Sequence, residues 1–76
     1  MKKLVEILVR ALVDDPDQVE VIEEQDDDTV TYRISVAPDD LGKVIGKDGK
    51  IANALRTITK AAAMKEGRKV YVDIMS

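Results

Sequence analysis

The chain has 76 residues, with twelve Lys or Arg against fifteen Asp or Glu, a net charge of −3, and neither cysteine nor histidine. A chain of this length has room for one small hydrophobic core. The composition excludes disulfide frameworks, thiolate metal sites and the Ser-His or Cys-His arrangements of hydrolases.

The first segment, residues 2–13, has the apolar spacing of an amphipathic helix. Its central stripe is formed by Leu4, Ile7, Leu8, Ala11 and Leu12, and Val5, Val9 and Val13 widen it. Pro16 disfavours helix at the residue before it, so the helix should end near Asp14-Asp15. The charges at Glu6 and Arg10 interrupt the apolar run, no signal-peptide cleavage site follows, and no stretch approaches the ~20 apolar residues that span a bilayer. A cytoplasmic protein is expected.

Three segments have the alternation of strands with one apolar face. They are residues 18–24, 29–37 and 69–74, and the middle one is the clearest, with Val30, Tyr32, Ile34 and Val36 on one side. We expect Tyr32 to lie in the core. Residues 25–28 join the first two strands and are interpreted as a solvated charged turn, because the spacing and glycine of a calcium-binding loop are missing.

Two more helices are predicted between the second and third strands. Pro38-Asp39-Asp40 begins a short one, with an Asp available to cap it, and that helix ends at Gly46. A longer helix runs over residues 50–66, with Ile51, Leu55, Ile58 and Ala62 on its apolar face and Gly67 closing it in the left-handed conformation. The order helix, strand, strand, helix, helix, strand indicates an α+β domain with helices covering one face of a sheet.

Charge is unevenly divided along the chain. Residues 1–40 contain four Lys or Arg and twelve Asp or Glu, a net −8, whereas residues 41–76 contain eight and three, a net +5. The second half can therefore hold a local anion site on an acidic chain. The alternative interpretation is a solvated surface with no ligand.

The segment from Leu41 to Ile51 carries the chemistry. Gly46 and Gly49 lie between two helices and leave their backbone amides open to a ligand, with Lys43, Lys47 and Lys50 around them. These features predict a shallow cradle for a sugar–phosphate backbone. Asp48 opposes that charge, and we expect it to turn inward and cap the following helix. An ordinary interhelical turn is the alternative.

Three other phosphate-binding loops are excluded by spacing. Gly42 and Gly46 have three residues between them where a P-loop needs four. After Lys47 the chain has Asp48, where a P-loop has Ser or Thr. Neither a dinucleotide-binding fingerprint nor a kinase glycine loop is present.

The sequence Val44-Ile45-Gly46-Lys47-Asp48-Gly49-Lys50-Ile51 resembles the V-I-G-x-x-G-x-x-I signature of KH domains. The element order matches the type II fold, αββααβ, which implies a three-stranded mixed sheet covered on one face by three helices. The resemblance extends over residues 1–76 as a single KH domain, and the short chain is similar to the bacterial KhpA family.

The resemblance implies binding of single-stranded RNA in a GxxG groove. The residues that match this site are Lys43, Val44, Ile45, Gly46, Lys47, Asp48, Gly49, Lys50 and Ile51. Val44, Ile45, Ile51 and Leu55 would form the floor of the groove, or else simply pack in the core. No cofactor, metal or catalytic residue is implied.

Partners follow from the same resemblance, because the KhpA family is associated with homodimers and with a larger KH-containing partner, KhpB. Ala61-Ala62-Ala63-Met64 is a candidate for close helix–helix contact, although an alanine run also simply favours helix. We expect an RNA chaperone or post-transcriptional regulator. The alternative is a protein-interaction module that binds little RNA itself.

Overall fold

The computed structural model describes residues 1–76 and contains the six predicted elements in the predicted order. The helices and strands are α1 (Lys2–Leu12), β1 (Glu20–Gln25), β2 (Thr29–Ser35), α2 (Leu41–Ile45), α3 (Lys50–Met64) and β3 (Lys69–Met75). Short 3₁₀ turns add η1 (Pro16–Gln18), η2 (Pro38–Asp40) and η3 (Lys47–Gly49). None of the helices has the length and apolar character needed to cross a bilayer.

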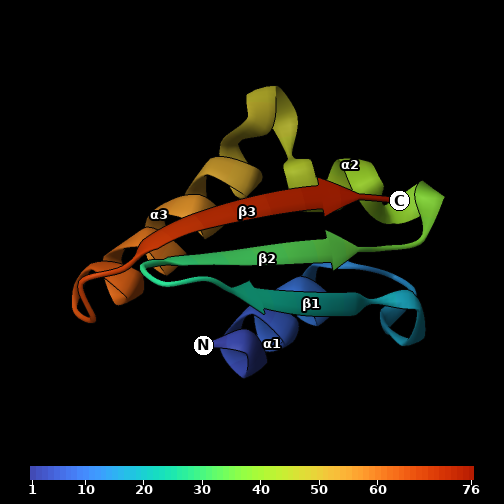
Figure 1. The fold of residues 1–76 in the computed structure, drawn as a ribbon. Coiled ribbons are helices and arrows are strands. Elements are labelled where there is room, and N and C mark those ends of the chain that lie inside the picture. Colours follow the sequence, from blue (N-terminus) through green and yellow to red (C-terminus); the bar gives the residue numbers. More distant parts are fainter.

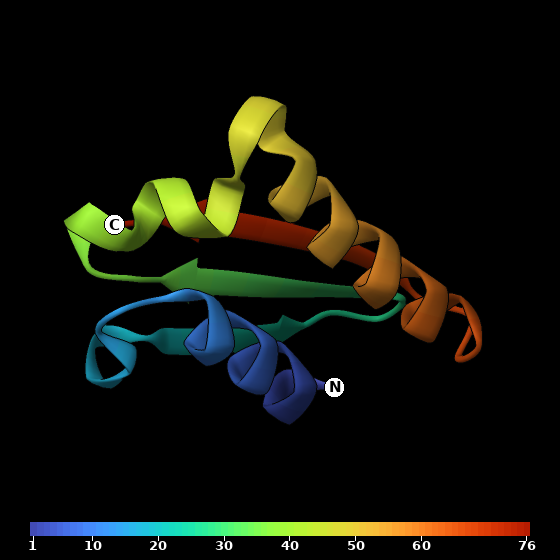
Figure 2. The same ribbon diagram turned by 180° about the vertical axis from the view of Figure 1, so that it is seen from behind.

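The sheet is mixed, with strand order β1-β2-β3. Strands β1 and β2 form an antiparallel pair in which Val21 lies opposite Ile34. Strand β3 is parallel to β2, with Val72 opposite Tyr32, because the crossover through α2 and α3 returns the chain in the same direction. All three α-helices lie on one face of the sheet and the other face carries none (Figures 1 and 2). The predicted α+β fold is confirmed.

The core lies between the sheet and the helices, and β2 supplies its centre. Tyr32 and Ile34 are 1% and 0% exposed, which confirms the prediction that Tyr32 is a core residue. Its hydroxyl donates a 2.7 Å hydrogen bond to Glu23 Oε1 on the neighbouring strand. Burial, together with this carboxylate, holds the pKa of the Tyr32 hydroxyl well above its usual value.

The buried faces of α1 and α3 differ from the predicted ones: each helix is turned about its axis, so that neighbouring residues face the sheet. On α1 the buried residues are Val5 and Val9, whereas Leu4 and Ile7 are exposed. On α3 the buried residues are Ala52, Leu55, Thr59 and Ala63, and Ile58 is exposed. Thr59 fits the core because its hydroxyl donates to the Leu55 carbonyl at 2.9 Å.

The end of α3 agrees with the prediction at one glycine and differs at the alanine run. Gly67 has φ +69°, and the Arg68 amide donates to the Ala63 carbonyl at 3.0 Å, so the helix is closed by a left-handed glycine as expected. Ala63 is completely buried, so it belongs to the core and not to an open contact surface. Only Ala61 and Met64 of that run are exposed.

Candidate nucleic-acid interface

The loop between α2 and α3 projects above the rest of the fold at the top of Figures 1 and 2. Three of its four residues have a positive φ: Gly46 at 78°, Asp48 at 57° and Gly49 at 75°. The Gly49 amide donates to the Gly46 carbonyl at 3.2 Å, which closes the turn η3. The side chains of Lys47 and Asp48 are exposed at its tip. The predicted segment thus forms one short, tightly turned loop.

Asp48 does not cap α3, and that prediction was wrong. The residue at the N-cap is Gly49, and no side chain donates or accepts a capping hydrogen bond there. With φ +57° and ψ 24°, Asp48 adopts the left-handed conformation, which Asp tolerates better than most residues. Its carboxylate is exposed, and the first turn of α3 carries the partial positive charge of a helix N-terminus that no side chain caps.

The lysines near the loop fall into two groups. The four ion pairs of the structure use Arg10, Arg33 and Lys43, so Lys47 and Lys50 have no carboxylate partner. Lys43 Nζ is hydrogen-bonded to Asp14 Oδ2, and lies 3.3 Å from Asp40 Oδ1. The bonds to Asp14 and then to Asp40 raise the pKa of Lys43. Lys47 and Lys50 are therefore the lysines of the segment that are free to meet a phosphate.

Asp40 fixes the position of α2, a role that the sequence did not show. An Asp of the segment Pro38-Asp39-Asp40 was expected to cap the short helix, but no capping bond forms. Instead the 2%-exposed carboxylate of Asp40 accepts hydrogen bonds from the amides of Asp14, at 3.2 Å, and Asp15, at 3.0 Å. Burial alone would raise the pKa of Asp40, but these amides and Lys43 outweigh it, so the pKa lies below its usual value. The spacing Asp40-x-x-Lys43 was the available sequence signal.

Of the four apolar residues expected at the groove floor, two are buried in the core and two lie beside the loop. Val44 is 0% and Leu55 4% exposed, and both belong to the core cluster. Ile45 and Ile51 are only partly buried and border the loop. The structure thus leaves Ile45 and Ile51 as the apolar surface next to Gly46–Gly49.

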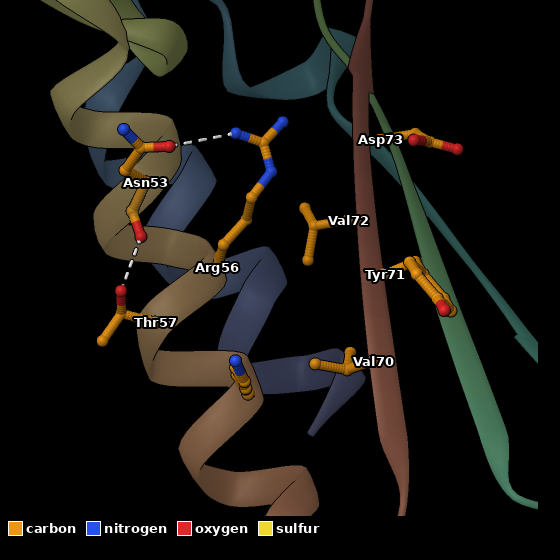
Figure 3. Close-up of a pocket in the computed structure, with 8 residues that line it drawn as sticks. Asn53, Arg56, Thr57, Val70, Tyr71, Val72 and Asp73 are labelled. Atoms are coloured by element: carbon orange, nitrogen blue, oxygen red, sulfur yellow. Dashed lines mark hydrogen bonds between the residues drawn. The ribbon is translucent and has the colours of Figure 1, made fainter.

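A groove of about 580 Å³ lies between α3 and the open edge of β3. Val70 and Val72 point from β3 toward α3, whereas Tyr71 and Asp73 point to the other side (Figure 3). The α3 wall is polar and basic and is formed by Asn53, Arg56, Thr57 and Lys60. Neither Arg56 nor Lys60 takes part in an ion pair.

Sequence reasoning did not single out this wall. Its signal was available in the spacing of Asn53, Arg56 and Lys60, which recur every three or four residues after the glycine loop and so share one side of the helix. The groove begins beside the loop, because Asn53 Nδ2 lies 4.0 Å from the position that a Cβ on Gly49 would occupy.

Comparison with known proteins gives consistent matches over almost the full chain. The family model described as the KhpA/KhpB KH domain matches residues 2–74. A Clostridium perfringens relative called RNA-binding protein KhpA is 51% identical over 75 residues, covering 99% of this chain and 100% of its own. Relatives of the same name from Halalkalibacterium halodurans and Listeria monocytogenes are 52% and 40% identical, each with 99% of both chains covered. No solved structure matches this chain.

Proposed function

Because the chain belongs to the KhpA/KhpB KH-domain family, a family of RNA-binding proteins and not of enzymes, we propose that it binds single-stranded RNA through Gly46–Gly49. Relatives about half identical to it carry the name of an RNA-binding protein. We infer that the chain acts in the cytoplasm as an RNA chaperone or a post-transcriptional regulator.

The observation that carries this proposal is the pairing of a projecting glycine loop, at the uncapped N-terminus of α3, with unpaired lysines. Gly46 and Gly49 let the loop turn tightly with no side chain at two of its four positions, and the N-terminal end of α3, which no side chain caps, supplies a partial positive charge. Lys47 and Lys50 add cations that no carboxylate neutralises. We assign the phosphate contacts to these two lysines and not to Lys43, because Asp14 and Asp40 already hold Lys43.

The groove between α3 and β3 extends the site from the loop. A strand whose phosphates lie on Gly46–Gly49 would place its bases between the polar wall of α3 and the side chains of Val70 and Val72. Tyr71 lines the groove, but its ring points away from α3 (Figure 3), so we expect the bases to gain little of the about 1–3 kcal/mol that stacking on an aromatic ring supplies. We therefore expect weak binding for each chain and a benefit from a second site on the same RNA.

Fluorescence anisotropy of a labelled unstructured RNA, at low and moderate salt, tests the loop. Lys47→Asp gives a loop with two adjacent carboxylates and keeps both glycines, so it should abolish most binding by repelling phosphates. Lys65→Asp is the matched control, because Lys65 is exposed at the far end of α3. Equal binding by the wild type and Lys47→Asp would place the RNA elsewhere.

A second role, contact with another KH chain, is favoured by exposed apolar side chains on the helical face. Leu4 and Ile7 on α1 are 43% and 58% exposed, and Ile58 and Met64 on α3 are 44% and 66% exposed. We propose that this surface contacts a second copy or a larger KH-containing partner similar to KhpB. If that contact is the main activity, the chain is an interaction module that binds little RNA alone.

Sedimentation equilibrium tests the partner surface with a matched pair of variants. Ile58→Glu should convert a concentration-dependent dimer into a monomer, because a carboxylate in an apolar contact remains unpaired. Ile22→Glu is the control, since Ile22 is equally exposed, at 46%, but lies on a strand. A monomeric wild type at all concentrations would rule out self-association and turn the search to the larger partner.

A further inference from the structure

Arg56 and Asn53 are neighbours at the loop end of the groove. They lie one helical turn apart on α3, and Arg56 Nη1 donates to Asn53 Oδ1 at 3.4 Å. The Arg56 guanidinium lies over the space between α3 and β3 (Figure 3). Because Asn53 Oδ1 faces Arg56, the other end of its amide, Nδ2, faces Gly49. It lies 4.0 Å from the position that a Cβ on Gly49 would occupy. The pair thus connects the loop with the interior of the groove.

Arg56 differs in position from the lysines that border the loop. Lys47 and Lys50 stand where the RNA backbone would lie, whereas Arg56 lines the groove that the bases would enter. Opposite it are the apolar side chains of Val70 and Val72, which suit the flat faces of bases. One N–H of Arg56 is hydrogen-bonded to Asn53. Because no carboxylate pairs with Arg56, its other N–H donors remain available to a ligand.

We propose that Arg56, oriented by Asn53, reads a base in the groove and selects one that presents two adjacent hydrogen-bond acceptors. The inference rests on the proposed RNA binding at Gly46–Gly49. The bases with this chemistry are cytosine, through O2 and N3, and guanine, through O6 and N7. The edges of an unpaired base are open to such contacts.

The selection follows from the shape of the guanidinium. Its planar fork offers two parallel N–H donors, which match two neighbouring acceptors and not an acceptor beside a donor. In adenine the Watson–Crick and Hoogsteen edges each combine one ring nitrogen acceptor with the amino donor, and the third edge has the single acceptor N3. In uracil the N3–H donor separates the two carbonyl acceptors. Adenine and uracil therefore leave one N–H of the fork without an acceptor.

Anisotropy with four short labelled RNAs tests this selection. One is an oligouridine, and in the others two adjacent central bases are replaced by cytosine, guanine or adenine. Wild type should bind the cytosine or the guanine RNA at least about five-fold more tightly than the adenine and uridine RNAs, the lower end of the discrimination by one two-donor contact. The cytosine and guanine arms decide which of the two bases the groove admits.

Arg56→Lys is the informative variant, because it keeps the charge and removes the fork. It should retain the weaker binding to oligouridine and lose the base preference, whereas Lys60→Gln should weaken all four RNAs alike. Arg56 and Lys60 are both exposed, so the two variants should melt like wild type. Equal wild-type affinity for all four RNAs, or a preference that survives in Arg56→Lys, would overturn the assignment while leaving the Lys47 result standing. Absence of wild-type binding to every RNA would overturn the proposed function and this assignment together.

Discussion

Gly46 and Ile51 are in contact across the glycine loop: a Cβ added to Gly46 would lie 2.6 Å from Ile51 Cγ1 and 2.9 Å from Ile51 Cβ. Gly46 also has φ 78° and ψ 172°, a region almost restricted to glycine. Packing and backbone conformation therefore both require glycine at this position. At Gly49 only the backbone requires glycine, because the atom nearest to an added Cβ would be Asn53 Nδ2, at 4.0 Å.

This difference predicts an order of stabilities for three alanine variants. Gly46→Ala should lower the free energy of unfolding by about 2–4 kcal/mol, because overpacking adds to backbone strain. Gly49→Ala should cost only the left-handed backbone, about 1–2 kcal/mol. Gly42→Ala should raise stability by about 0.5–1 kcal/mol, since Gly42 is helical with nothing within 4 Å of its added Cβ. Urea unfolding measures all three, and equal stability of Gly46→Ala and Gly49→Ala would contradict the contact.

The sequence was sufficient for the order of elements and for the loop. Period-two alternation in β2 and β3, and glycines at Gly46, Gly49 and Gly67, are local signals that depend little on the rest of the fold. All three glycines have a positive φ, a conformation that had been predicted for Gly67.

The buried sectors of the helices were not predictable to the same degree. Apolar residues cover more than one side of α1, so periodicity alone does not decide whether Val5 and Val9 or Leu4 and Ile7 meet the sheet. On α3, Thr59 is buried in place of Ile58 because its hydroxyl bonds to its own helix. The roles of Asp40 and Asp48 depended on which amides come within reach in three dimensions, as the contact of Asp40 with Asp14 and Asp15 illustrates.

Lys43 and Lys50 should differ in RNA binding, although both flank the loop. Lys50→Gln should weaken binding and reduce the slope of log affinity against log salt by about 0.7, the value for one phosphate contact on a single strand. Lys43→Gln should lower the melting temperature and leave that slope unchanged, because Asp14 and Asp40 hold its ammonium. Anisotropy over a series of salt concentrations gives both slopes. An equal loss of slope would show that RNA displaces the two carboxylates.

Tyr32 should remain protonated beyond the usual range of tyrosine. In a Tyr71→Phe variant Tyr32 is the sole tyrosine, so phenolate absorbance should not appear near pH 10 and should rise only at higher pH or when the chain unfolds. Because the pKa is raised in the folded state, the stabilising effect is fully present below about pH 10 and is lost as the pH rises through the folded-state pKa. Tyr32→Phe should cost about 1 kcal/mol at neutral pH through loss of the bond to Glu23. Titration of the phenol near pH 10 in the folded chain would contradict its burial.

Asp40 should stabilise the fold in its charged form, and acid should remove that effect. Its pKa is lower in the folded chain than in the unfolded chain, where it is about 3.9, so the contribution is fully present above about pH 4 and is lost as the pH falls through the folded-state pKa. Asp40→Asn should lower the melting temperature by several degrees at neutral pH, because the amides of Asp14 and Asp15 bond to different carboxylate oxygens and Asn replaces one of these oxygens with an NH₂ donor.

Thermal melts of Asp40→Asn and wild type from neutral pH down to about pH 3 separate this charge effect from a change of shape. The difference in melting temperature should stay constant down to about pH 4 and shrink below it, since protonated Asp40, like Asn, carries a donor group on one of the two positions that accept in the carboxylate. Asp39→Asn is the control, because Asp39 is exposed beside Asp40 and should melt like wild type at every pH. A difference that persists unchanged into acid would mean that the carboxylate charge does not stabilise the junction of α1 and α2.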